Sequence, residues 1–533
     1  MNNKVTADIK NSIRSFRSLL SYCLKCYAEL PIMICSTGAV TYYSFIENVR
    51  RYCAYALKQH ESFIAIDLSS PVEYAAAYLG VVLSRHVACL ISEDRARVFW
   101  GESCAVISDS ISCLIKNETP VALHDIEDGD PYTPCTAALS SGTSAEPKCI
   151  LLSQRGILAS ALYGGEQYGF WEGERLVHVL PYWHLFGLAA DLIAPMTYGA
   201  CVCMPDSPIG FFSAMKKYKP NSVSIPPALA FGICKAIGQV GSVEAVTGGS
   251  LQKVLVAGAA LDLDTSQKLL SYGVTPCTAY GMTECSPCIS ISSPNDCYIG
   301  TVGKPIGCME VHIADDGEIT VRGENVMVGY LNDERATKEK IRDGWLHTGD
   351  IGCFDSAGNL VITGRKSNML VFSDGFKCIP EAIEAKISEL PFVDESLLAS
   401  STDDCHAILT VVSDDPEKVD RASICAIMSE AGLSVYELKI KTERLKKTNW
   451  ERCYDDMTVE ELTTIVKECV ECDKNTIDLR DRLKEDLMMT SFSMMMLVVK
   501  TEEKMGLSVD ERLLAEAKTV QDLLDIINGT VKE

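Results

Sequence analysis

The chain has 533 residues, of which 47% are hydrophobic and 23% are charged, and its formal net charge at pH 7 is −23. A chain of this length builds more than one core, so about two to four domains are expected, and the hydrophobic content excludes intrinsic disorder. The acidic charge argues against a nucleic-acid partner, because binding a phosphate backbone requires a basic face.

Hydropathy and cysteine usage indicate the cellular compartment of the protein. The sequence contains no run of about 18 apolar residues, so no membrane span is expected. Its first residues are charged and amphipathic rather than typical of a signal peptide. The 24 cysteines are scattered, which predicts reduced thiols in a cytoplasmic protein. Nothing brings two C-x-x-C pairs together as a zinc site requires, so no structural metal is expected. The pairs are Cys23/Cys26, Cys285/Cys288 and Cys469/Cys472.

Residues 1–364 alternate strand-like apolar runs with helical patterns. The clearest apolar runs are 63–66, 176–180 and 254–256, and 317–323 reads as the arm of a hairpin. Strands separated by helices predict α/β layers with mostly parallel sheets.

The segment 139–148 reads Leu-Ser-Ser-Gly-Thr-Ser-Ala-Glu-Pro-Lys. Small residues let backbone N–H groups approach an anion, hydroxyls add donors, and the lysine adds a positive charge. The segment therefore predicts a phosphate-binding loop, although such a cluster is also typical of an ordinary loop. It is not a Walker A loop, because the pattern G-x-x-x-x-G-K-S/T is absent.

Three further segments follow in order along the chain. They are Tyr280-Gly281-Met282-Thr283-Glu284, Thr348-Gly349-Asp350 and Gly364-Arg365-Lys366. Together with the loop, they resemble the adenylate-forming (AMP-binding) superfamily of acyl-CoA synthetases, peptide-synthetase adenylation domains and luciferases. The resemblance covers roughly residues 10–450. It implies a large multi-sheet α/β domain at 1–364 and a small mobile α+β lid domain at 365–452. Within the lid we expect a helix after Pro380 and a strand at 407–412.

Residues 455–533 differ from the rest of the chain. They contain no proline and an excess of acidic residues, and their three or four helical periods predict a small acidic helical bundle, which the resemblance described next implies to be an all-α four-helix carrier bundle. The segment Asp486-Leu-Met-Met-Thr-Ser491-Phe-Ser resembles the attachment motif of acyl and peptidyl carrier domains. Ser491 matches the serine that takes 4′-phosphopantetheine, while Met488, Thr490 and Phe492 depart from the usual glycine, aspartate and leucine. The alternative is that Ser491 is an ordinary helix N-cap.

The resemblance gives each motif a role in activating a carboxylic acid with ATP and Mg²⁺. Thr283 is expected to contact the α-phosphate and Glu284 to bind magnesium. Asp350 is expected to accept hydrogen bonds from the ribose hydroxyls, with Arg365 also at the nucleotide. As alternatives, Glu284 could be a surface helix cap, and Asp350 and Arg365 could be turn residues. The residues expected at the β- and γ-phosphates are Ser141, Gly142, Thr143, Ser144 and Lys148.

Pro181-Tyr-Trp-His184-Leu-Phe186-Gly resembles the acyl-site segment of the family, in which His184 borders the substrate carboxylate. Phe186 stands where amino-acid-activating members carry an aspartate, and an apolar residue cannot compensate a buried ammonium. The substrate is therefore expected to be a fatty or other non-amino acid. Gly258-Ala259-Ala260 and Tyr280-Gly281 are expected to line its pocket.

The end of the lid departs from the family. Ser367 stands at the usual hinge position of Asp or Lys. The family closes the lid with a glycine-lysine segment whose lysine acts in adenylation. Here Arg452 aligns nearest, with Lys446 or Lys447 as substitutes.

The sequence thus predicts an AMP-forming acid–thiol ligase that loads its own carrier domain. Its expected partners are a carboxylic acid, a phosphopantetheinyl transferase and a downstream synthase or reductase. Two alternatives stay open. One is a free acyl-CoA ligase with a regulatory C-terminal bundle. The other is a degenerate nucleotide-binding protein that presents a carrier without ligase activity.

Overall fold

The computed structural model describes residues 10, 12–90, 104–139, 148–205, 211–372, 377–393, 395–400, 406–413, 415, 418–433, 436–441, 459, 462–463, 466–467, 477–483, 497 and 517–527. Contacts divide the chain into two compact units. The first comprises Met1–His312, Thr320–His347 and Phe354–Val361, and the second comprises Ile313–Ile319, Thr348–Cys353 and Ile362–Glu533.

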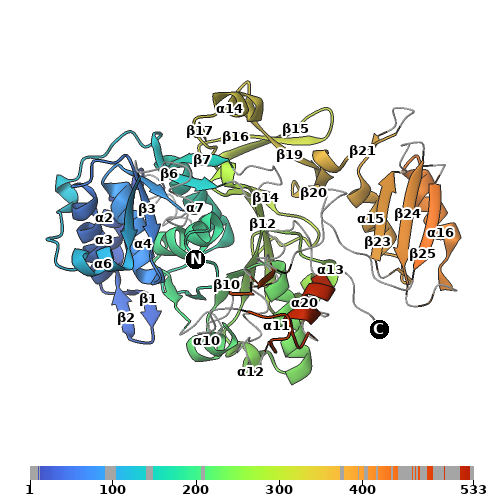
Figure 1. The fold of residues 1–533 in the computed structure, drawn as a ribbon, viewed down its shortest axis with the longest axis horizontal. Coiled ribbons are helices and arrows are strands. Elements are labelled where there is room, and N and C mark those ends of the chain that lie inside the picture. The colour runs from blue at the N-terminus through green and yellow to red at the C-terminus, as the bar shows by residue number, and fades with distance from the viewer. Residues whose placement is uncertain are drawn as a thin grey trace. The chain divides into compact units, whose positions relative to one another are not determined.

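A nine-stranded sheet has the order β14-β13-β12-β11-β10-β8-β9-β1-β2. Strands β8, β10, β11 and β12 are neighbours and run parallel, as the alternation of strands and helices predicts. Their carboxyl ends therefore share one edge of the sheet (Figure 1). The bounds are β1 Pro31–Cys35, β2 Gly38–Thr41, β8 Arg175–Val177, β9 Cys201–Cys203, β10 Ser222–Ile225, β11 Lys253–Val256, β12 Thr275–Gly281, β13 Cys288–Ile291 and β14 Lys304–Pro305.

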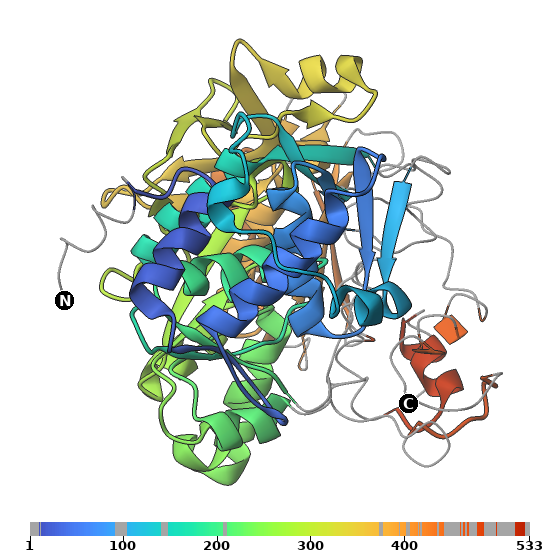
Figure 2. The same ribbon diagram turned by 90° about the vertical axis from the view of Figure 1, so that its left-hand side faces the viewer.

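A six-stranded sheet has the order β17-β7-β6-β4-β3-β5. Its bounds are β3 Phe63–Asp67, β4 Val87–Cys89, β5 Cys104–Ser108, β6 Pro134–Leu139, β7 Cys149–Ser153 and β17 Gly329–Tyr330. Helices α2 (Phe16–Tyr27), α3 (Tyr42–Ala56) and α4 (Pro71–Leu83) pack together beside it, as the blue helices of Figure 2 show. Gly80 allows the close approach of α4 to α3, because a Cβ there would lie 2.5 Å from Cβ of Tyr52.

Helix α7 (Gln154–Tyr168) follows β7 directly and begins at an N-cap serine, because Oγ of Ser153 accepts the N–H of Gly156 at 3.0 Å. Gly169 ends the helix in the left-handed conformation that favours glycine. The other helices of this part are α6 Asp109–Ile115, α8 Leu185–Leu188, α9 Ala194–Thr197, α10 Phe211–Tyr218, α11 Pro227–Val240, α12 Val243–Thr247, α13 Leu263–Ser271 and α14 Glu334–Lys340.

A third, five-stranded sheet has the order β15-β16-β19-β18, with β20 paired to β19. The bounds are β15 Met309–Ile313, β16 Glu318–Gly323, β18 Ile341–Arg342, β19 Trp345–Phe354 and β20 Leu360–Arg365. The hairpin arm expected at 317–323 is thus confirmed as β16.

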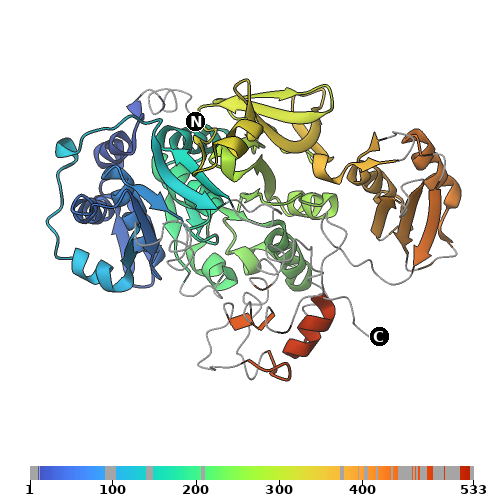
Figure 3. The same cartoon turned by 45° about the horizontal axis from the view of Figure 1, so that its top comes forward.

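The second unit also contains a two-stranded sheet, β21 (Leu370–Val371) with β22 (Lys377–Cys378), and a three-stranded sheet of order β23-β24-β25. Helices α15 (Pro380–Ser388) and α16 (Arg421–Glu430) share one hydrophobic core with the three-stranded sheet (Figure 3). The three strands are β23 Glu395–Ser400, β24 Ala407–Val412 and β25 Tyr436–Lys441. The helix after Pro380 and the strand 407–412 are therefore confirmed. Within 455–533, α20 (Val520–Ile527) is described as a helix that buries Leu523.

One predicted strand is shorter than expected. The strand expected at 176–180 ends at Val177. The N–H of Val179 donates instead to the carboxylate of Asp191 at 3.3 Å, and Pro181 has no N–H to continue a ladder. Where the large domain ends and the lid begins, at residue 364, stays a prediction.

Candidate active site

The predicted phosphate loop joins two neighbouring antiparallel strands. Strand β6 ends at Leu139 and β7 begins at Cys149, and these two residues are cross-strand partners. Lys148 lies immediately before β7 and is described. The loop residues Ser141, Gly142, Thr143 and Ser144 lie outside the described residues, so their phosphate contacts stay predictions.

Tyr330 joins Lys148 to Glu284. Strand β17 pairs antiparallel with β7, and this register places Tyr330 opposite Ile150. Nζ of Lys148 lies 5.1 Å from the centroid of the Tyr330 ring, within the range of a cation–π contact. The Tyr330 hydroxyl donates to Oε1 of Glu284 at 2.8 Å. Burial and the charge of Glu284 raise the pKa of Tyr330, so its hydroxyl remains a donor.

Glu284 lies in a 3₁₀ turn, Thr283–Cys285, directly after β12. The turn is fixed by segment 325–327: the N–H of Met327 donates to the carbonyl of Glu284 at 2.8 Å, and the side-chain amide of Asn325 donates to the carbonyl of Cys285 at 2.8 Å. Gly281 is required before the turn, because a Cβ there would lie 1.8 Å from the carbonyl oxygen of Pro287. Glu284 is therefore a buried carboxylate and not an exposed helix cap.

The donor set fits magnesium bound together with phosphates. Mg²⁺ sites of this kind use one or two carboxylates, with water and phosphate oxygens completing the octahedron. Glu284 supplies one carboxylate; Tyr330 occupies one lone pair of one oxygen, and others remain for a metal. Within the described ranges there is no group of three or more His, Cys, Asp or Glu side chains that could hold a metal without such help.

The acyl-site residues lie at the shared carboxyl edge of the parallel strands. His184 follows β8, Gly258-Ala259-Ala260 follow β11, and Tyr280 lies near the end of β12. Ligands bind outside the carboxyl ends of strands in open α/β sheets. The fold thus brings these residues to the same edge as Thr283 and Glu284, although they are separated by up to about a hundred positions in the sequence.

His184 is the N-cap of α8, where its Nδ1 accepts the N–H of Phe186 at 3.3 Å. Its ring packs edge to face with Trp183, with centroids 6.4 Å apart. The side chain is exposed, yet the protein atoms around the ring withhold part of its hydration and lower the pKa of His184. A neutral imidazole with one nitrogen engaged in a cap can present the other to a ligand.

Asp350 and Arg365 come together in the second unit. Asp350 lies on β19 and Arg365 at the end of β20, and Nε of Arg365 is 3.2 Å from Oδ1 of Asp350. The Asp350 side chain is largely buried, whereas that of Arg365 is mostly exposed. The backbone at Asp350 is fixed by Thr348, whose Oγ1 accepts its N–H at 3.0 Å. Asp350 and Arg365 are therefore a carboxylate and a guanidinium held next to each other, and not two unrelated turn residues.

Lys366 and Ser367 follow Arg365. Nζ of Lys366 lies 2.6 Å from Oδ2 of Asp316 and 2.8 Å from Oε2 of Glu318, and these bonds raise the pKa of Lys366. Ser367 Oγ donates to the side-chain oxygen of Asn368 at 3.2 Å. Arg452, Lys446, Lys447 and the attachment serine Ser491 lie outside the described residues.

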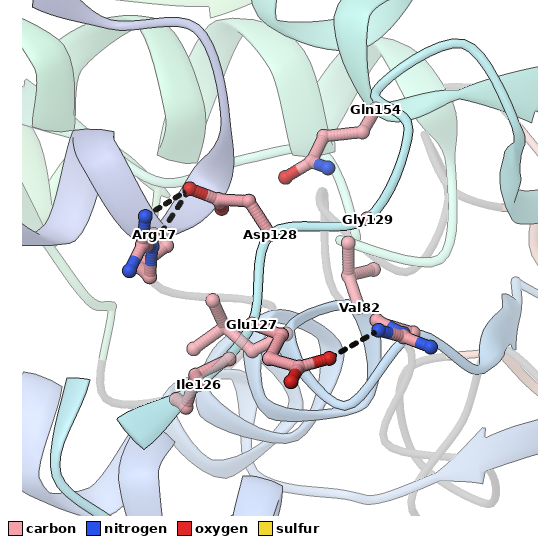
Figure 4. Close-up of a pocket in the computed structure, with 9 residues that line it drawn as sticks. Arg17, Val82, Ile126, Glu127, Asp128, Gly129 and Gln154 are labelled. Atoms are coloured by element: carbon pink, nitrogen blue, oxygen red, sulfur yellow. Dashed lines mark hydrogen bonds and ion pairs between the residues drawn. The ribbon is translucent and has the colours of Figure 1, made fainter. Parts of the chain in front are cut away.

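A small pocket lies between α2, α4 and the segment Ile126–Gly129 (Figure 4). Arg17 pairs there with Asp128, and Nη1 of Arg85 is 3.3 Å from Oε2 of Glu127. The pocket contains none of the predicted site residues. Its charges are paired with each other, so it joins chain segments and offers no free charge to a ligand.

Sequence reasoning missed Tyr330 and Asn325. Both bond to the Glu284 turn from about forty positions further along the chain, and neither belongs to a motif singled out above. The short Val-Gly-Tyr-Leu run around Tyr330 gives only a weak strand signal.

Two protein families match this chain. Residues 101–331 match the AMP-binding enzyme family, and residues 460–527 match the phosphopantetheine attachment site. In the part of the chain that is described, no helix has the length and apolarity to cross a membrane.

Three relatives are named as CoA ligases. A long-chain-fatty-acid–CoA ligase, FadD15, of Mycobacterium bovis is 36% identical over 32% of this chain and 28% of the relative. A 2-succinylbenzoate–CoA ligase of Bacillus cereus is 30% identical over 50% and 57%. 4-Coumarate:CoA ligase 1 of Petunia hybrida is 27% identical over 60% and 63%. The chain thus spans less than two thirds of the length of each.

Solved structures share the fold. ATP-bound MatB of Rhodopseudomonas palustris superposes with a TM-score of 0.68 at 19% identity, over 82% of this chain and 96% of that structure. The anthranilate CoA ligase AuaEII gives a TM-score of 0.66 at 18% identity, over 83% and 96%. The α/β multi-sheet adenylate-forming fold is therefore confirmed.

Proposed function

We propose that this chain, an AMP-binding enzyme domain joined to a phosphopantetheine attachment site, activates a carboxylic acid with ATP and loads it onto its own carrier domain. The observation that carries the proposal is the contact of Tyr330 with both Lys148 and Glu284, in a chain that also matches the phosphopantetheine attachment site. The group provides a cation and a metal-binding carboxylate where two anions have to meet.

In the first half-reaction, a carboxylate oxygen of the acid attacks the α-phosphorus of ATP. A bond forms between this oxygen and phosphorus, the bond to the leaving oxygen breaks, and pyrophosphate leaves. Both reactants are anionic, so fixed positive charge and orientation lower the barrier. Lys148 supplies positive charge beside the phosphate loop, Glu284 would hold Mg²⁺, which neutralises phosphate charge when bound, and Asp350 with Arg365 holds the nucleoside.

In the second half-reaction the acyl carbon passes from AMP to sulfur. The pantetheine arm on Ser491 supplies the thiol when attached. With the arm in place, the C–S bond would form as the C–O bond to AMP breaks, and the thiol proton would be released to water. A tethered acceptor raises the effective concentration of thiol to the millimolar range.

The acid is fatty or another non-amino acid. Phe186, in α8 beside His184, gives no charge that could pair with a substrate ammonium. The enzyme would work in the cytoplasm, where its many scattered cysteines would stay reduced thiols. A phosphopantetheinyl transferase would supply the arm, and a synthase or reductase would consume the thioester.

The intact mass of the full chain tests the proposal. The protein is treated with CoA and a broad phosphopantetheinyl transferase, then with ATP, magnesium and a panel of fatty and aryl acids. We expect one pantetheine arm and then one acyl group. Ser491→Ala should take neither, whereas the matched control Ser493→Ala, two residues further on, should take both. An arm on Ser491→Ala, or no arm on the wild type, would refute the carrier assignment.

Assays of acyl-CoA and pyrophosphate in the same reaction mixtures separate the alternatives. A free acyl-CoA ligase would release acyl-CoA at an equal rate from Ser491→Ala and wild type. A degenerate protein would bind ATP but release no pyrophosphate with any acid. The relatives found are CoA ligases, which favours an active enzyme over the degenerate alternative.

A further inference from the structure

Helix α8 continues into α9 through one π-helical turn, Ala189–Ile193. The N–H of Ala194 donates to the carbonyl of Ala189, five residues back. Pro195 has no N–H, so the carbonyl of Asp191 lacks the donor that a regular α-helix would give it. Single π turns inside α-helices are frequent at functional sites.

The carbonyl of Asp191 receives a different donor, the hydroxyl of Tyr182, at 3.3 Å. The side chain of Asp191 bonds to the same segment of chain: Oδ2 accepts the N–H of Val179 at 3.3 Å and lies 3.6 Å from Nδ1 of His178. The rings of His178 and Tyr182 pack with centroids 4.4 Å apart. Asp191 therefore holds both flanks of the short loop that leads from β8 to His184.

Burying the polar groups of Asp191 and His178 lowers the stability of the fold. Asp191 is completely buried, and His178 and Tyr182 are nearly so. Among the described residues, neither Oδ1 of Asp191 nor Nδ1 of His178 has a hydrogen-bond partner. Burying polar atoms without partners costs on the order of 1–3 kcal/mol each. An apolar residue at position 191 would avoid this cost. The presence of an aspartate there therefore calls for an explanation.

His184 depends on this loop for its position. Its N–H donates to the carbonyl of Pro181 at 3.0 Å, and its carbonyl accepts the N–H of Leu188 at 3.0 Å. The turn 181–184 is thus fixed on one side by α8 and on the other by residues 179 and 182, which Asp191 bonds. A shift of this turn would displace the imidazole from the shared carboxyl edge.

We propose that Asp191, acting through Tyr182 and the backbone of Val179, is a positioning residue that holds His184 at the substrate carboxylate. The inference rests on the proposed function only for the role of His184; the structural coupling stands without it. Asp191 is completely buried, so its loss should act through His184 alone.

The first measurement is the rate at which diethyl pyrocarbonate modifies His184, followed by peptide mass spectrometry of the full chain. Asp191→Ala and Tyr182→Phe should raise this rate several-fold, because a loosened turn releases Nδ1 from the Phe186 N–H. Thr197→Val is the matched control: it removes a buried hydrogen bond to the carbonyl of Ile193 in the same helical segment without touching the turn. It should leave the rate unchanged. This readout needs no enzymatic activity.

The second measurement is acid-dependent pyrophosphate release. Asp191→Ala should lower kcat/KM for the acid about tenfold or more, since small misplacements of reacting groups are that costly. KM for ATP should stay within about twofold of wild type. General unfolding would not lower kcat/KM for the acid while leaving KM for ATP unchanged. In a His184→Ala background, Asp191→Ala should cause no further loss, because coupled residues are not additive.

Tyr182→Phe, which removes one hydroxyl only, keeps the test decisive if Asp191→Ala does not fold. Unchanged His184 modification in folded variants of both positions would overturn the inference, whatever the activity. If the variants change the rate of His184 modification but the wild type shows no acid-dependent turnover, the proposed function is refuted, while the structural coupling of Asp191 to His184 stands. Additive losses in the double variant would likewise show that Asp191 does not act through His184.

Discussion

The hydroxyl of Tyr330 donates to Oε1 of Glu284 at 2.8 Å, while Nζ of Lys148 lies 5.1 Å from the centroid of the same ring. One aromatic side chain therefore contacts both the lysine at the end of the predicted phosphate loop and the predicted magnesium carboxylate. Three segments that are distant in sequence meet at this ring, because β17 pairs with β7 and the Glu284 turn is bonded to residues 325–327.

Replacing Tyr330 with Phe should slow adenylation while preserving the fold. The variant keeps the ring under Lys148 but leaves the Glu284 carboxylate without its donor. Hydrogen bonds to charged groups are worth about 1.5–3 kcal/mol, so pyrophosphate release should fall about ten- to a hundredfold. Tyr43→Phe, at an exposed tyrosine, is the control and should match wild type. Wild-type kinetics at every magnesium concentration in Tyr330→Phe would contradict the role given to this hydroxyl.

Asp350→Asn should weaken nucleotide binding. The amide keeps the shape of the side chain, but it loses the charge that pairs with Arg365 and one of the two acceptors that a ribose diol needs. We expect KM for ATP to rise about tenfold, with little change in KM for the acid. Asp316→Asn, an exposed carboxylate paired with Lys366, controls for the loss of an acidic residue in the same unit. Equal KM values in the two variants would remove Asp350 from the nucleotide site.

A buried ion pair away from the site should dominate stability. Nζ of Lys253 lies 3.3 Å from Oε1 of Glu174 and donates to the carbonyls of Tyr168 and Gly169 at 3.0 and 2.9 Å. Lys253→Met leaves the buried carboxylate uncompensated and should lower the free energy of unfolding by about 3–5 kcal/mol. Lys268→Met, in an exposed pair with Asp264, should cost less than about 0.5 kcal/mol. Denaturant unfolding at pH 8 measures both, and similar losses would contradict the assignment.

The pH dependence of stability should carry a contribution from Glu174. Burial raises the pKa of Glu174 from 4.5 to about 7, against the opposing effect of Lys253. Because the folded state binds this proton more tightly than the unfolded chain, the contribution is full below pH 4.5 and is lost as the pH rises through about 7. Glu174→Gln cannot titrate. The wild type should therefore lose stability relative to Glu174→Gln across this window, and a constant difference from pH 4.5 to 8 would exclude the shift.

Local sequence patterns were enough to single out several candidate site residues. Lys148, Glu284, Asp350 and Arg365 all stand in short motifs of glycine, hydroxyl and charged residues that are neighbours in the chain. The structure places Glu284 directly after β12, as the strand-like run before it predicts. The pairing of Asp350 with Arg365 was not predicted, and their roles at the nucleotide stay predictions. Predictions for Ser141, Gly142, Thr143, Ser144, Arg452 and Ser491 lie outside the described residues and stay predictions.

The sequence by itself determined the order of the motifs, the α/β alternation and the type of chemistry, because these depend on residues that are neighbours in the chain. Only the tertiary structure decided which distant side chains meet. Tyr330 reaches Glu284 through the register of β17 on β7, and Asp191 reaches the loop before His184 because Pro195 frees its carbonyl in a π turn. Such contacts depend on strand register and close packing between segments, which no local periodicity encodes.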